Sequence, residues 1–514
     1  MFSSVKSAAV YGIEARVITC EADVSEGLPF FSMVGFLASE VKEAKDRVRT
    51  ALRNTGLPLR PKHITINLSP ADIKKSGTGF DLPIALAVLC ASEMLTAESL
   101  NDTLVVGELG LDGEIKGISG ILPVVLCARD AGIKRVIVPR DNVMEGAVVS
   151  DVECIGAAHI SEVVEYLMGA DVPQMQPVHV DAETFFLSEQ EGKYEDFADV
   201  VGQKVARRAV EIAAAGQHNI ILSGPPGAGK TMIARRIPGI MPKLSFEESM
   251  ELSRIYSVAG LLSDKHFLVT ERPFRSPHHT ATVTSIIGGG QYPKPGECSL
   301  SYNGILYFDE FSEYPREVIE ALRQPLEDRK VNISRLSASY TYPAGFMLVG
   351  SMNPCPCGCY PDRNRCTCSV GMINRYRRRI SQAILDRIDL CISVEAVSFD
   401  DLKSRGGGEC SRDIRARVEK ARIIQQKRYA GTEINFNSQL TSTGIKEYCK
   451  LDGEGEKLME EAFNKMDMSA RGYHRILRVA RTIADLEGAE DIRKEHLSEA
   501  LGYRMNIGAG EVVK

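Results

Sequence analysis

An octapeptide near the middle of the chain has the composition of a phosphate-binding loop. Residues 224–231 read Gly-Pro-Pro-Gly-Ala-Gly-Lys-Thr and fit the pattern G-x-x-x-x-G-K-[ST]. The glycines let backbone N–H groups close around a polyphosphate, while Lys230 reaches the β- and γ-phosphates and Thr231 ligates Mg²⁺. We therefore expect ATP to contact the whole loop: Gly224, Pro225, Pro226, Gly227, Ala228, Gly229, Lys230 and Thr231.

Two adjacent carboxylates further along the chain could complete a metal and water site. Asp309 and Glu310 directly follow the apolar run 304–308. A carboxylate at the tip of a strand can hold the Mg²⁺ shell, and its neighbour can orient the water that attacks the γ-phosphate. Either motif alone could be a glycine-rich turn or a strand that ends in solvated acids. Their order and spacing predict a domain that binds ATP and Mg²⁺ and hydrolyses ATP.

Hydrophobic runs are placed to hold both motifs at the ends of strands. Residues 219–222 predict a buried strand before the loop, and residues 232–236 begin a helix whose N-terminal dipole favours phosphate. Alternating strand and helix patterns continue beyond the second motif, which predicts a parallel sheet. Ser245 and Glu248 have capping-box spacing and predict the start of another helix.

The sequence on either side of this core divides into further segments. Residues 1–170 alternate strand-like and helical patterns, and residues 171–198 carry prolines, glutamines and acids without periodicity, which is typical of a linker. The nucleotide-binding core is expected over 199–400, and residues 408–514 have wholly helical patterns. The helices expected there span 412–428, 442–448, 455–466, 469–486 and 493–503.

The first segment should form one unit of strands and helices. Its first helix is expected over 39–54, where Gly56 stops it. Buried helices are expected over 82–94 and 121–131. The expected strands are 8–19, 63–68, 103–109, 135–139 and 152–155.

The bulk composition is that of a globular protein in a reducing compartment. Of 514 residues, 44% are hydrophobic and 25% are charged, and no apolar stretch approaches membrane-spanning length. The N-terminus has no signal-peptide core, so we expect a cytoplasmic protein without membrane contact. Thirteen cysteines in so long a chain fit free thiols or a metal site better than a disulfide framework. Because the net charge is −6, any contact with nucleic acid must come from local basic patches.

Five of the cysteines cluster between residues 355 and 368. Cys355, Cys357, Cys366 and Cys368 form two C-x-C units, and four thiolates can bind a structural Zn²⁺ tetrahedrally. Cys359 lies between these units and leaves the fourth ligand open. Reduced thiols in a loop are the alternative. Bound zinc would stiffen the loop, and its binding would contribute to folding.

Further motifs occur in the order in which AAA+ ATPases carry them. Val201 and Gly202 resemble the box beside the adenine, and Asn353 resembles sensor 1, which contacts the γ-phosphate or the attacking water. Arg387 resembles an arginine finger, and Arg471 resembles sensor 2. Any single arginine could instead form a surface ion pair. The resemblance implies that Arg387 acts on a neighbouring subunit's ATP, which requires a ring or filament, whereas Arg471 could act in cis or in trans.

Longer strings in the core are more specific. They are Arg-Ser-Pro-His-His-Thr at 275–280, Pro-Lys-Pro-Gly-Glu at 293–297, Arg-Gln-Pro-Leu-Glu at 323–327 and Asn-Pro-Cys-Pro-Cys-Gly at 353–358. Together they resemble the magnesium-chelatase-like AAA+ proteins of the ComM and YifB family, over essentially the whole chain. The resemblance implies a hexameric ATPase acting on single-stranded or branched DNA, as a branch-migration helicase in recombination or natural transformation.

Residues 107–139 resemble part of the protease domain of Lon. A Lon-type peptidase needs a serine nucleophile and a lysine base. Here the stretch 75–81 has Gly or Phe at the serine position, depending on the alignment, and 120–125 contains no amine. The resemblance therefore implies a fold retained without peptidase chemistry. The predicted fold class is α/β, a P-loop AAA+ core with a parallel sheet and a helical lid, preceded by an α+β Lon-protease-like domain of the ribosomal S5 domain 2 type.

Two segments are candidates for DNA contact. The first is the hairpin that the family carries before sensor 1, which is expected here over 331–342 and is flanked by Lys330 and Arg335. The family also carries a helix-2 insert, which is expected over 272–299. The other candidate is a basic stretch, which could equally line a subunit interface. Its arginines are Arg363, Arg365, Arg375, Arg377, Arg378 and Arg379.

Other functions compete with a DNA motor. A chelatase-like machine could use the same ATPase to remodel a protein partner, and an ATP-gated scaffold could bind DNA with little turnover. An ATP-dependent protease is disfavoured because the serine–lysine pair is missing. The sequence favours the DNA motor.

Overall fold

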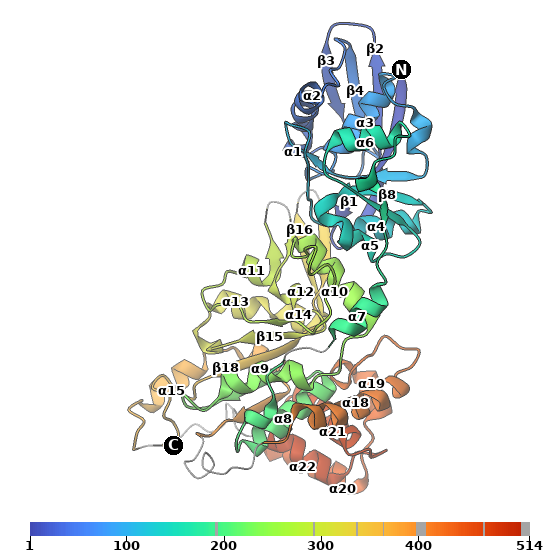
Figure 1. Cartoon of the computed structure of the whole chain (residues 1–514). Helices are drawn as coiled ribbons and strands as arrows, with labels where there is room; N and C mark the ends of the chain where they lie inside the picture. Colours follow the sequence, from blue (N-terminus) through green and yellow to red (C-terminus); the bar gives the residue numbers. More distant parts are fainter. Residues whose placement is uncertain are drawn as a thin grey trace.

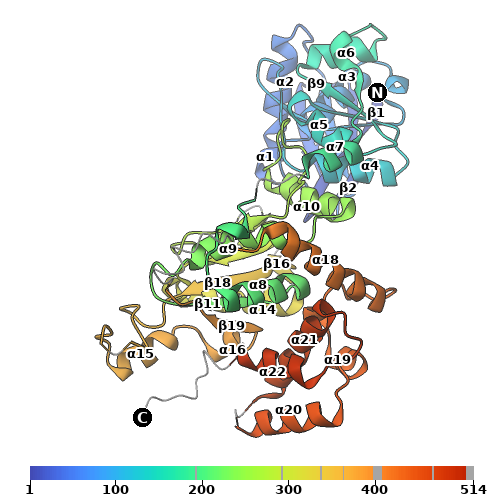
Figure 2. The same cartoon turned by 60° about the horizontal axis from the view of Figure 1, so that its bottom comes forward.

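Three bodies follow one another along the chain in the computed structural model (Figure 1). The structure describes residues 1–190, 194–290, 293–335, 338–362, 364–396, 408–465 and 468–504. The N-terminal body lies at one end, the nucleotide-binding core in the middle and the lid helices at the other end, as Figure 1 and Figure 2 both show. Within the described ranges no helix is long and apolar enough to cross a membrane.

A mixed sheet of eight strands forms the N-terminal body among the described residues, in the order β10-β9-β8-β5-β1-β2-β4-β3. Helix α3 (Asp81–Ala91) packs on β1 and β2 and is buried along its whole length, as its apolar sequence predicts. The strands are β1 (Phe2–Tyr11), β2 (Glu14–Ser25), β3 (Phe30–Val34), β4 (His63–Ser69), β5 (Thr103–Val105), β8 (Arg135–Pro139), β9 (Glu153–Ala157) and β10 (Pro177–Val178).

The segment 8–19, predicted as one strand, is a hairpin instead. Strands β1 and β2 pair antiparallel, with Tyr11 opposite Glu14. Gly12 turns the chain with a φ of +69°, which glycine adopts without strain. The single-strand prediction was wrong because so short a turn leaves no gap in the hydrophobic pattern. The helix expected over 39–54 is likewise divided at Glu43, into α1 (Ser39–Lys42) and α2 (Ala44–Asn54).

A parallel sheet forms the nucleotide-binding core, as predicted. Its order is β12-β15-β18-β11-β19, and each neighbouring pair is parallel. The carboxyl ends of β11, β15 and β18 therefore meet at one edge of the sheet. The strands are β11 (Ile220–Ser223), β12 (Phe274–Arg275), β15 (Ile305–Phe308), β18 (Met347–Met352) and β19 (Leu390–Ser393).

The hairpin expected before sensor 1 is present and touches the N-terminal body. Strands β16 (Lys330–Arg335) and β17 (Ala338–Pro343) pair antiparallel, and residues 336–337 lie outside the described residues. The rings of Tyr11 and Tyr340 have centroids 4.7 Å apart, and the Tyr11 hydroxyl donates to the Ser339 carbonyl at 3.2 Å. The turn of the β1–β2 hairpin thus rests on the β16–β17 hairpin.

The expected linker over 171–198 contains regular structure. Strand β10 pairs with β9 at the edge of the N-terminal sheet, and helix α7 (Ala182–Glu189) follows it. Met175 and Phe186 are buried. The sequence showed no periodicity here because the elements are too short to display one. Residues 191–193 lie outside the described residues.

The lid is helical, and its predicted helices are confirmed to within a few residues. They are α18 (Ser411–Arg428), α19 (Ser442–Tyr448), α20 (Gly453–Lys465), α21 (Ala470–Leu486) and α22 (Lys494–Gly502). Side chains cap two of these helices, where Thr441 and Ser469 accept hydrogen bonds from backbone amides at the starts of α19 and α21. Of the predicted lid, residues 466–467 and 505–514 lie outside the described residues.

The N-terminal body and the core share one hydrophobic cluster. Leu122 and Val125, on α4 (Ile121–Asp130), pack together with Leu252 on α10 (Phe246–Ala259) and with Phe267. Helix α10 begins at the capping box predicted from Ser245 and Glu248. Because this apolar surface is continuous between the two bodies, we infer that they are held together as parts of one fold.

A buried carboxylate lies in the same interface. Glu145, on α5 (Val143–Ala147), accepts hydrogen bonds from the Leu122 amide at 2.9 Å and from the Ser257 hydroxyl of α10 at 2.5 Å. Burial raises the pKa of Glu145, although these hydrogen bonds and one from Asn142 act in the opposite direction. The charged form is therefore held in the interface at a cost.

Replacing Glu145 should separate its hydrogen bonding from its charge. Glu145→Ala leaves the Leu122 amide and the Ser257 hydroxyl without their acceptor and should destabilise the protein by about 1–3 kcal/mol. Glu145→Gln keeps the acceptor and removes the charge, so it should cost less. Because the folded pKa is raised, the wild type should gain stability relative to the Gln variant as pH falls. Urea midpoints at neutral and mildly acidic pH test this, and equal losses in both variants would contradict it.

Candidate nucleotide-binding site

The phosphate-binding loop lies between β11 and α9 (Lys230–Ile240), as its sequence predicts. Gly227 and Gly229 have φ of +80° and +86°, which favours glycine at both positions. Gly224 is needed for a different reason, since a Cβ atom there would lie 2.2 Å from the Val394 carbonyl. Its amide donates to the Met352 carbonyl at the end of β18, at 3.1 Å. The loop is thus anchored to the strands on either side of β11.

The Lys230 ammonium lies between the loop and sensor 1. It donates to the carbonyls of Gly224 at 2.6 Å and Pro225 at 2.9 Å, and to Asn353 Oδ1 at 3.2 Å. Burial lowers the pKa of Lys230, while Asp309 and Glu310 act to raise it. The sequence-predicted Lys230 and Asn353 are therefore brought into direct contact.

A cluster of oxygens surrounds the expected metal position. Thr231 Oγ1 donates to Asp309 Oδ2 at 3.2 Å, and the other carboxylate oxygen accepts from Ser351 Oγ at 2.5 Å. The Tyr307 hydroxyl donates to Thr231 Oγ1 at 3.2 Å. Carboxylate and hydroxyl oxygens are the ligands that Mg²⁺ prefers, so Thr231 and Asp309 fit the metal predicted for them.

Glu310 occupies a strained turn directly after the strand that carries Asp309. Its φ is +52°, which costs a residue with a Cβ on the order of 1–2 kcal/mol. Its amide donates to Asp309 Oδ1 at 3.1 Å and to Ser351 Oγ at 3.2 Å. These bonds hold the backbone in the strained conformation. The carboxylates of Asp309 and Glu310 therefore point in different directions at the sheet edge.

The expected adenine box and the phosphate loop both contact the segment that follows β19. Gly202 has a φ of +69°, and the side chain of the next residue, Gln203, donates to the Glu395 carbonyl at 2.5 Å. Val394, which precedes Glu395, is the residue against which Gly224 packs. The box containing Val201 and Gly202 is therefore linked to the phosphate loop by the chain that leaves β19.

The two predicted arginines lie together, away from this cluster. Arg387 and Arg471 both form ion pairs with Glu327, on α14 (Arg323–Asp328), and each uses a different carboxylate oxygen. The distance from Arg471 Nη2 to Glu327 Oε1 is 3.2 Å. Among the described residues, neither guanidinium has a hydrogen bond or ion pair with Asp309 or Glu310. One subunit therefore presents both arginines as a pair.

Arg475 holds the segment that carries Arg387. This buried side chain donates from Nη1 to the carbonyls of Leu385 at 2.9 Å and Ile388 at 2.8 Å. Burial lowers its pKa to about 10, so it stays charged at neutral pH. From the other side, the Asn219 amide donates to the Arg387 carbonyl at 2.9 Å. The segment is thus tied both to the lid helix α21 and to the base of the sheet.

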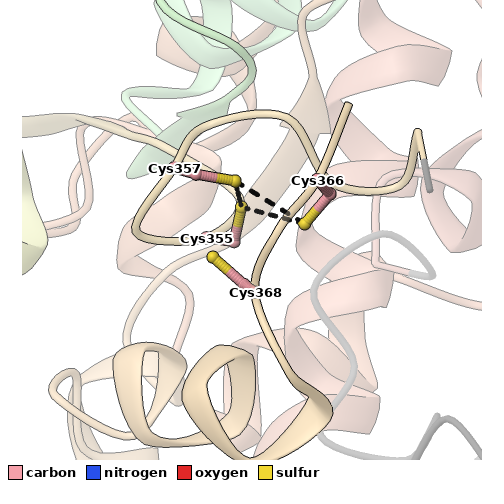
Figure 3. Close-up of side chains that lie close together, drawn as sticks. All are labelled: Cys355, Cys357, Cys366 and Cys368. Carbon is pink, nitrogen blue, oxygen red and sulfur yellow. Dashed lines mark hydrogen bonds between the residues drawn. The ribbon is translucent and has the colours of Figure 1, made fainter. Parts of the chain in front are cut away.

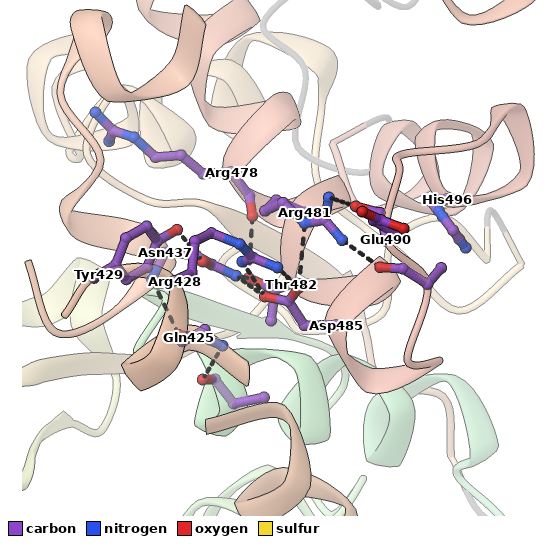
Figure 4. A network of polar contacts seen from close by, with 12 residues as sticks. Gln425, Arg428, Tyr429, Asn437, Arg478, Arg481, Thr482, Asp485, Glu490 and His496 are labelled. Atoms are coloured by element: carbon purple, nitrogen blue, oxygen red, sulfur yellow. Dashed lines mark hydrogen bonds and ion pairs between the residues drawn. The ribbon is translucent and has the colours of Figure 1, made fainter. Parts of the chain in front are cut away.

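A polar network fixes α21 within the lid (Figure 4). Asp485 is buried and accepts from Arg428 at 2.6 Å and from Arg481 at 3.2 Å. Gln425, in the same network, donates to the Ala215 carbonyl of α8 (Lys204–Gly216) at 3.0 Å. Since Arg471 and Arg475 lie on α21, this network positions both of them relative to the core.

Four thiols of the loop that follows β18 lie close together (Figure 3). The sulfurs of Cys355, Cys357, Cys366 and Cys368 all lie within 4.8 Å of one another. Cys359 lies outside this set and donates to the Cys357 carbonyl at 3.6 Å. The Cys359 amide is the main factor that lowers the pKa of Cys357, to about 5. The set fits a tetrahedral thiolate site for Zn²⁺.

Side chains of the basic stretch and of the Lon-like stretch contact residues elsewhere in the chain. Arg377 lies 5.1 Å from the ring centroid of Tyr360, and Arg379 pairs with Glu313 at 2.6 Å. Arg363, in the same basic stretch, lies outside the described residues. Within the stretch 75–81, which was compared with the serine loop of Lon, the Thr78 hydroxyl donates to Glu108 rather than to a lysine.

Sequence reasoning missed several residues that complete the site. Ser351 was part of the sensor 1 segment, and Glu327 was part of a family string, but neither was given a role. Arg475 and Asn219 act on backbone carbonyls far away in the sequence. A periodic pattern carries no signal for such contacts.

Comparison with known families matches most of the chain. The family described as "Magnesium chelatase, subunit ChlI" matches residues 196–402, and "Subunit ChlI of Mg-chelatase" matches residues 20–142. "Magnesium chelatase, subunit ChlI C-terminal" matches residues 408–504. These three matches fall on the core, the N-terminal body and the lid.

Individual relatives extend over the full length. The chain is 42% identical to competence protein ComM of Haemophilus influenzae, over 98% of this chain and 97% of that protein. It is also 42% identical to the uncharacterised protein YifB of Escherichia coli, with the same coverage. A shorter match, 26% identical over 28% of this chain and 26% of the relative, is to Lon protease 2 of Bacillus subtilis.

Proposed function

The chain belongs to the magnesium-chelatase-like family of AAA+ ATPases that includes the ComM and YifB proteins, and from that premise we propose that it is a ring-forming motor that uses ATP hydrolysis to move along DNA. The family makes it an ATPase that uses ATP and Mg²⁺. Single-stranded or branched DNA is the proposed substrate, and branch migration is the proposed activity. The name of the Haemophilus relative, a competence protein, supports a role in natural transformation.

The observation that carries the proposal is the convergence of three strand ends on one phosphate loop. Lys230 would hold the β- and γ-phosphates, with Gly224–Thr231 around them and Val201 and Gly202 beside the base. Thr231 and Asp309 would ligate Mg²⁺, and Glu310 would orient the attacking water. Asn353, already hydrogen bonded to Lys230, would contact the γ-phosphate.

The second half of the site would come from the next subunit. Arg387 and Arg471 pair with the two oxygens of Glu327 and therefore lie close together in one subunit. We propose that both act in trans, stabilising charge on the neighbour's ATP as it is hydrolysed. A ring or filament is then required, and a hexameric ring is the family expectation.

Cys355, Cys357, Cys366 and Cys368 are proposed to hold a structural Zn²⁺. Four thiolates leave no open position for water, so the metal would contribute to folding and not to hydrolysis.

Purified protein should migrate a branched DNA junction when ATP and Mg²⁺ are supplied, and the Glu310→Gln variant should not. Single-stranded or branched DNA should raise ATP turnover several-fold. Because the contacts are to phosphates, binding should weaken linearly in log–log plots against salt. ATP turnover that is insensitive to DNA, together with no junction migration, would reject the DNA motor and favour remodelling of a protein partner.

A further inference from the structure

The cysteine loop rests directly on the phosphate loop. A Cβ atom at Gly358 would lie 2.5 Å from Pro226 Cδ and 3.2 Å from Pro226 Cγ. Gly358 also has a φ of +76°, so both its backbone conformation and its surroundings favour glycine. The proline ring is rigid and cannot turn aside as a flexible side chain would. Only a residue without a side chain therefore lets the two loops approach so closely.

The same stretch of chain touches the nucleotide site a second time. Asn353, which accepts from Lys230 at 3.2 Å, lies two residues before Cys355. The chain thus contacts Lys230 through Asn353 and Pro226 through Gly358. Cys355 and Cys357 lie between these two contact residues in the sequence. Any change in the path from residue 353 to residue 358 would alter both contacts together.

Three of the four thiols are spaced nearly as a bound metal would require, and the fourth, that of Cys368, lies within 4.8 Å of them. The Cys355 sulfur lies 3.4 Å from that of Cys357 and 3.8 Å from that of Cys366, and Cys357 and Cys366 are 3.6 Å apart. A tetrahedral zinc with bonds of about 2.3 Å separates its sulfurs by about 3.8 Å. The Tyr360 amide donates to the Cys355 sulfur at 3.4 Å, a contact that stabilises a thiolate. All thirteen cysteines are free of disulfide bonds.

Turns, and not regular elements, order this loop. Residues 353–369 contain no helix or strand among the residues that the structure describes, and their small apolar cluster consists of Cys355, Cys368 and Ile373 with partly buried neighbours. Ordering an irregular loop costs backbone entropy at every residue. A metal that ties two C-x-C units together removes much of that freedom before nucleotide binds.

We propose that Zn²⁺ held by Cys355, Cys357, Cys366 and Cys368 braces the phosphate loop, so that metal occupancy sets the affinity for ATP. This inference rests on the proposed assignment of residues 224–231 to ATP binding. The brace acts through Gly358 against Pro226 and through Asn353 against Lys230. The metal-closed loop is therefore a positioning element for the nucleotide, and its four metal-binding cysteines take no part in hydrolysis.

The test compares zinc content with nucleotide affinity in the full-length protein. Protein purified without chelators should carry about one zinc per chain. Removing the metal with a chelator under reducing conditions should weaken the binding of a fluorescent ATP analogue about tenfold or more, and adding Zn²⁺ back should restore it. The Cys366→Ser and Cys368→Ser variants should lose zinc and affinity together.

Gly358→Ala separates the brace from the folding of the loop. This variant keeps all four thiols and should keep its zinc, yet it should bind the ATP analogue about tenfold more weakly, because the new methyl group pushes the loops apart. Gly431→Ala is the matched control, since Gly431 has a φ of +81° but no atom within 4 Å of a Cβ placed there. It carries the same backbone strain without the contact and should bind the analogue like the wild type.

Three results would overturn the proposal: purified protein without zinc, metal-free protein that binds ATP as tightly as before, or a Gly358→Ala variant that behaves like Gly431→Ala. Failure of the underlying nucleotide assignment has another signature. In that case Lys230→Ala would bind the analogue as tightly as the wild type, whatever the zinc content.

Discussion

Replacing Glu310 with Gln should reduce ATP hydrolysis by at least about 100-fold while ATP binding is retained. The amide has the shape of the carboxylate but is a much weaker base, so the attacking water loses its acceptor. The backbone should not change, because the hydrogen bonds that hold the strained turn come from the Glu310 amide and not from its side chain. Turnover at saturating ATP and the affinity for a fluorescent analogue give the two numbers needed.

Two other variants serve as comparisons, one that should lose ATP binding and one that should behave like the parental protein. Lys230→Ala should lose binding as well as turnover, because it removes the cation between the loop and Asn353. Glu313→Gln is the matched control, since Glu313 lies three residues away and pairs with Arg379 at the surface. It should hydrolyse ATP at the parental rate. Parental turnover by Glu310→Gln would remove Glu310 from the site.

Mixing two inactive variants should restore ATP hydrolysis if the site is shared between subunits. Arg387→Ala alone should reduce the rate by about 10³–10⁵-fold. When it is mixed with Lys230→Ala, some interfaces combine an intact phosphate loop from the first variant with an intact Arg387 from the second. A statistical fraction of the parental rate should return, measured over a range of mixing ratios.

A second mixture decides on which ATP Arg471 acts. If Arg387 and Arg471 both act on the neighbour, no interface between Arg387→Ala and Arg471→Ala subunits contains both arginines, and the mixture should stay inactive. If Arg471 acts on its own subunit's ATP, the same mixture should recover. The shared Glu327 leads us to expect no recovery. Arg412→Ala serves as the control, because Arg412 is exposed and should change nothing.

The sequence predicted those parts of the fold that local chemistry determines. The phosphate loop was found from its glycine pattern, the parallel core sheet from its hydrophobic runs and the lid helices from their helical periodicity. The β1–β2 hairpin was missed because a two-residue turn leaves the apolar pattern unbroken. The strand and helix within 171–198 were missed because each is too short to show a period.

The residues of the candidate site that could be predicted are those that lie in local sequence motifs. Lys230, Thr231, Asp309 and Asn353 lie in motifs, and the structure brings them together. Glu327 could not be assigned, because its role depends on two arginines that lie 60 and 144 residues away in the chain. The choice between Cys359 and the other cysteines also needed coordinates, since spacing alone permits several sets.

The apolar cluster shared by α4 and α10 bears on how this protein can be dissected. A fragment that began after residue 198 would expose the face that Leu252 and Phe267 turn towards Leu122 and Val125, and such surfaces promote self-association. The N-terminal body is therefore no removable adaptor. Packing between the two bodies thus makes the N-terminal body part of the folding unit of the motor core.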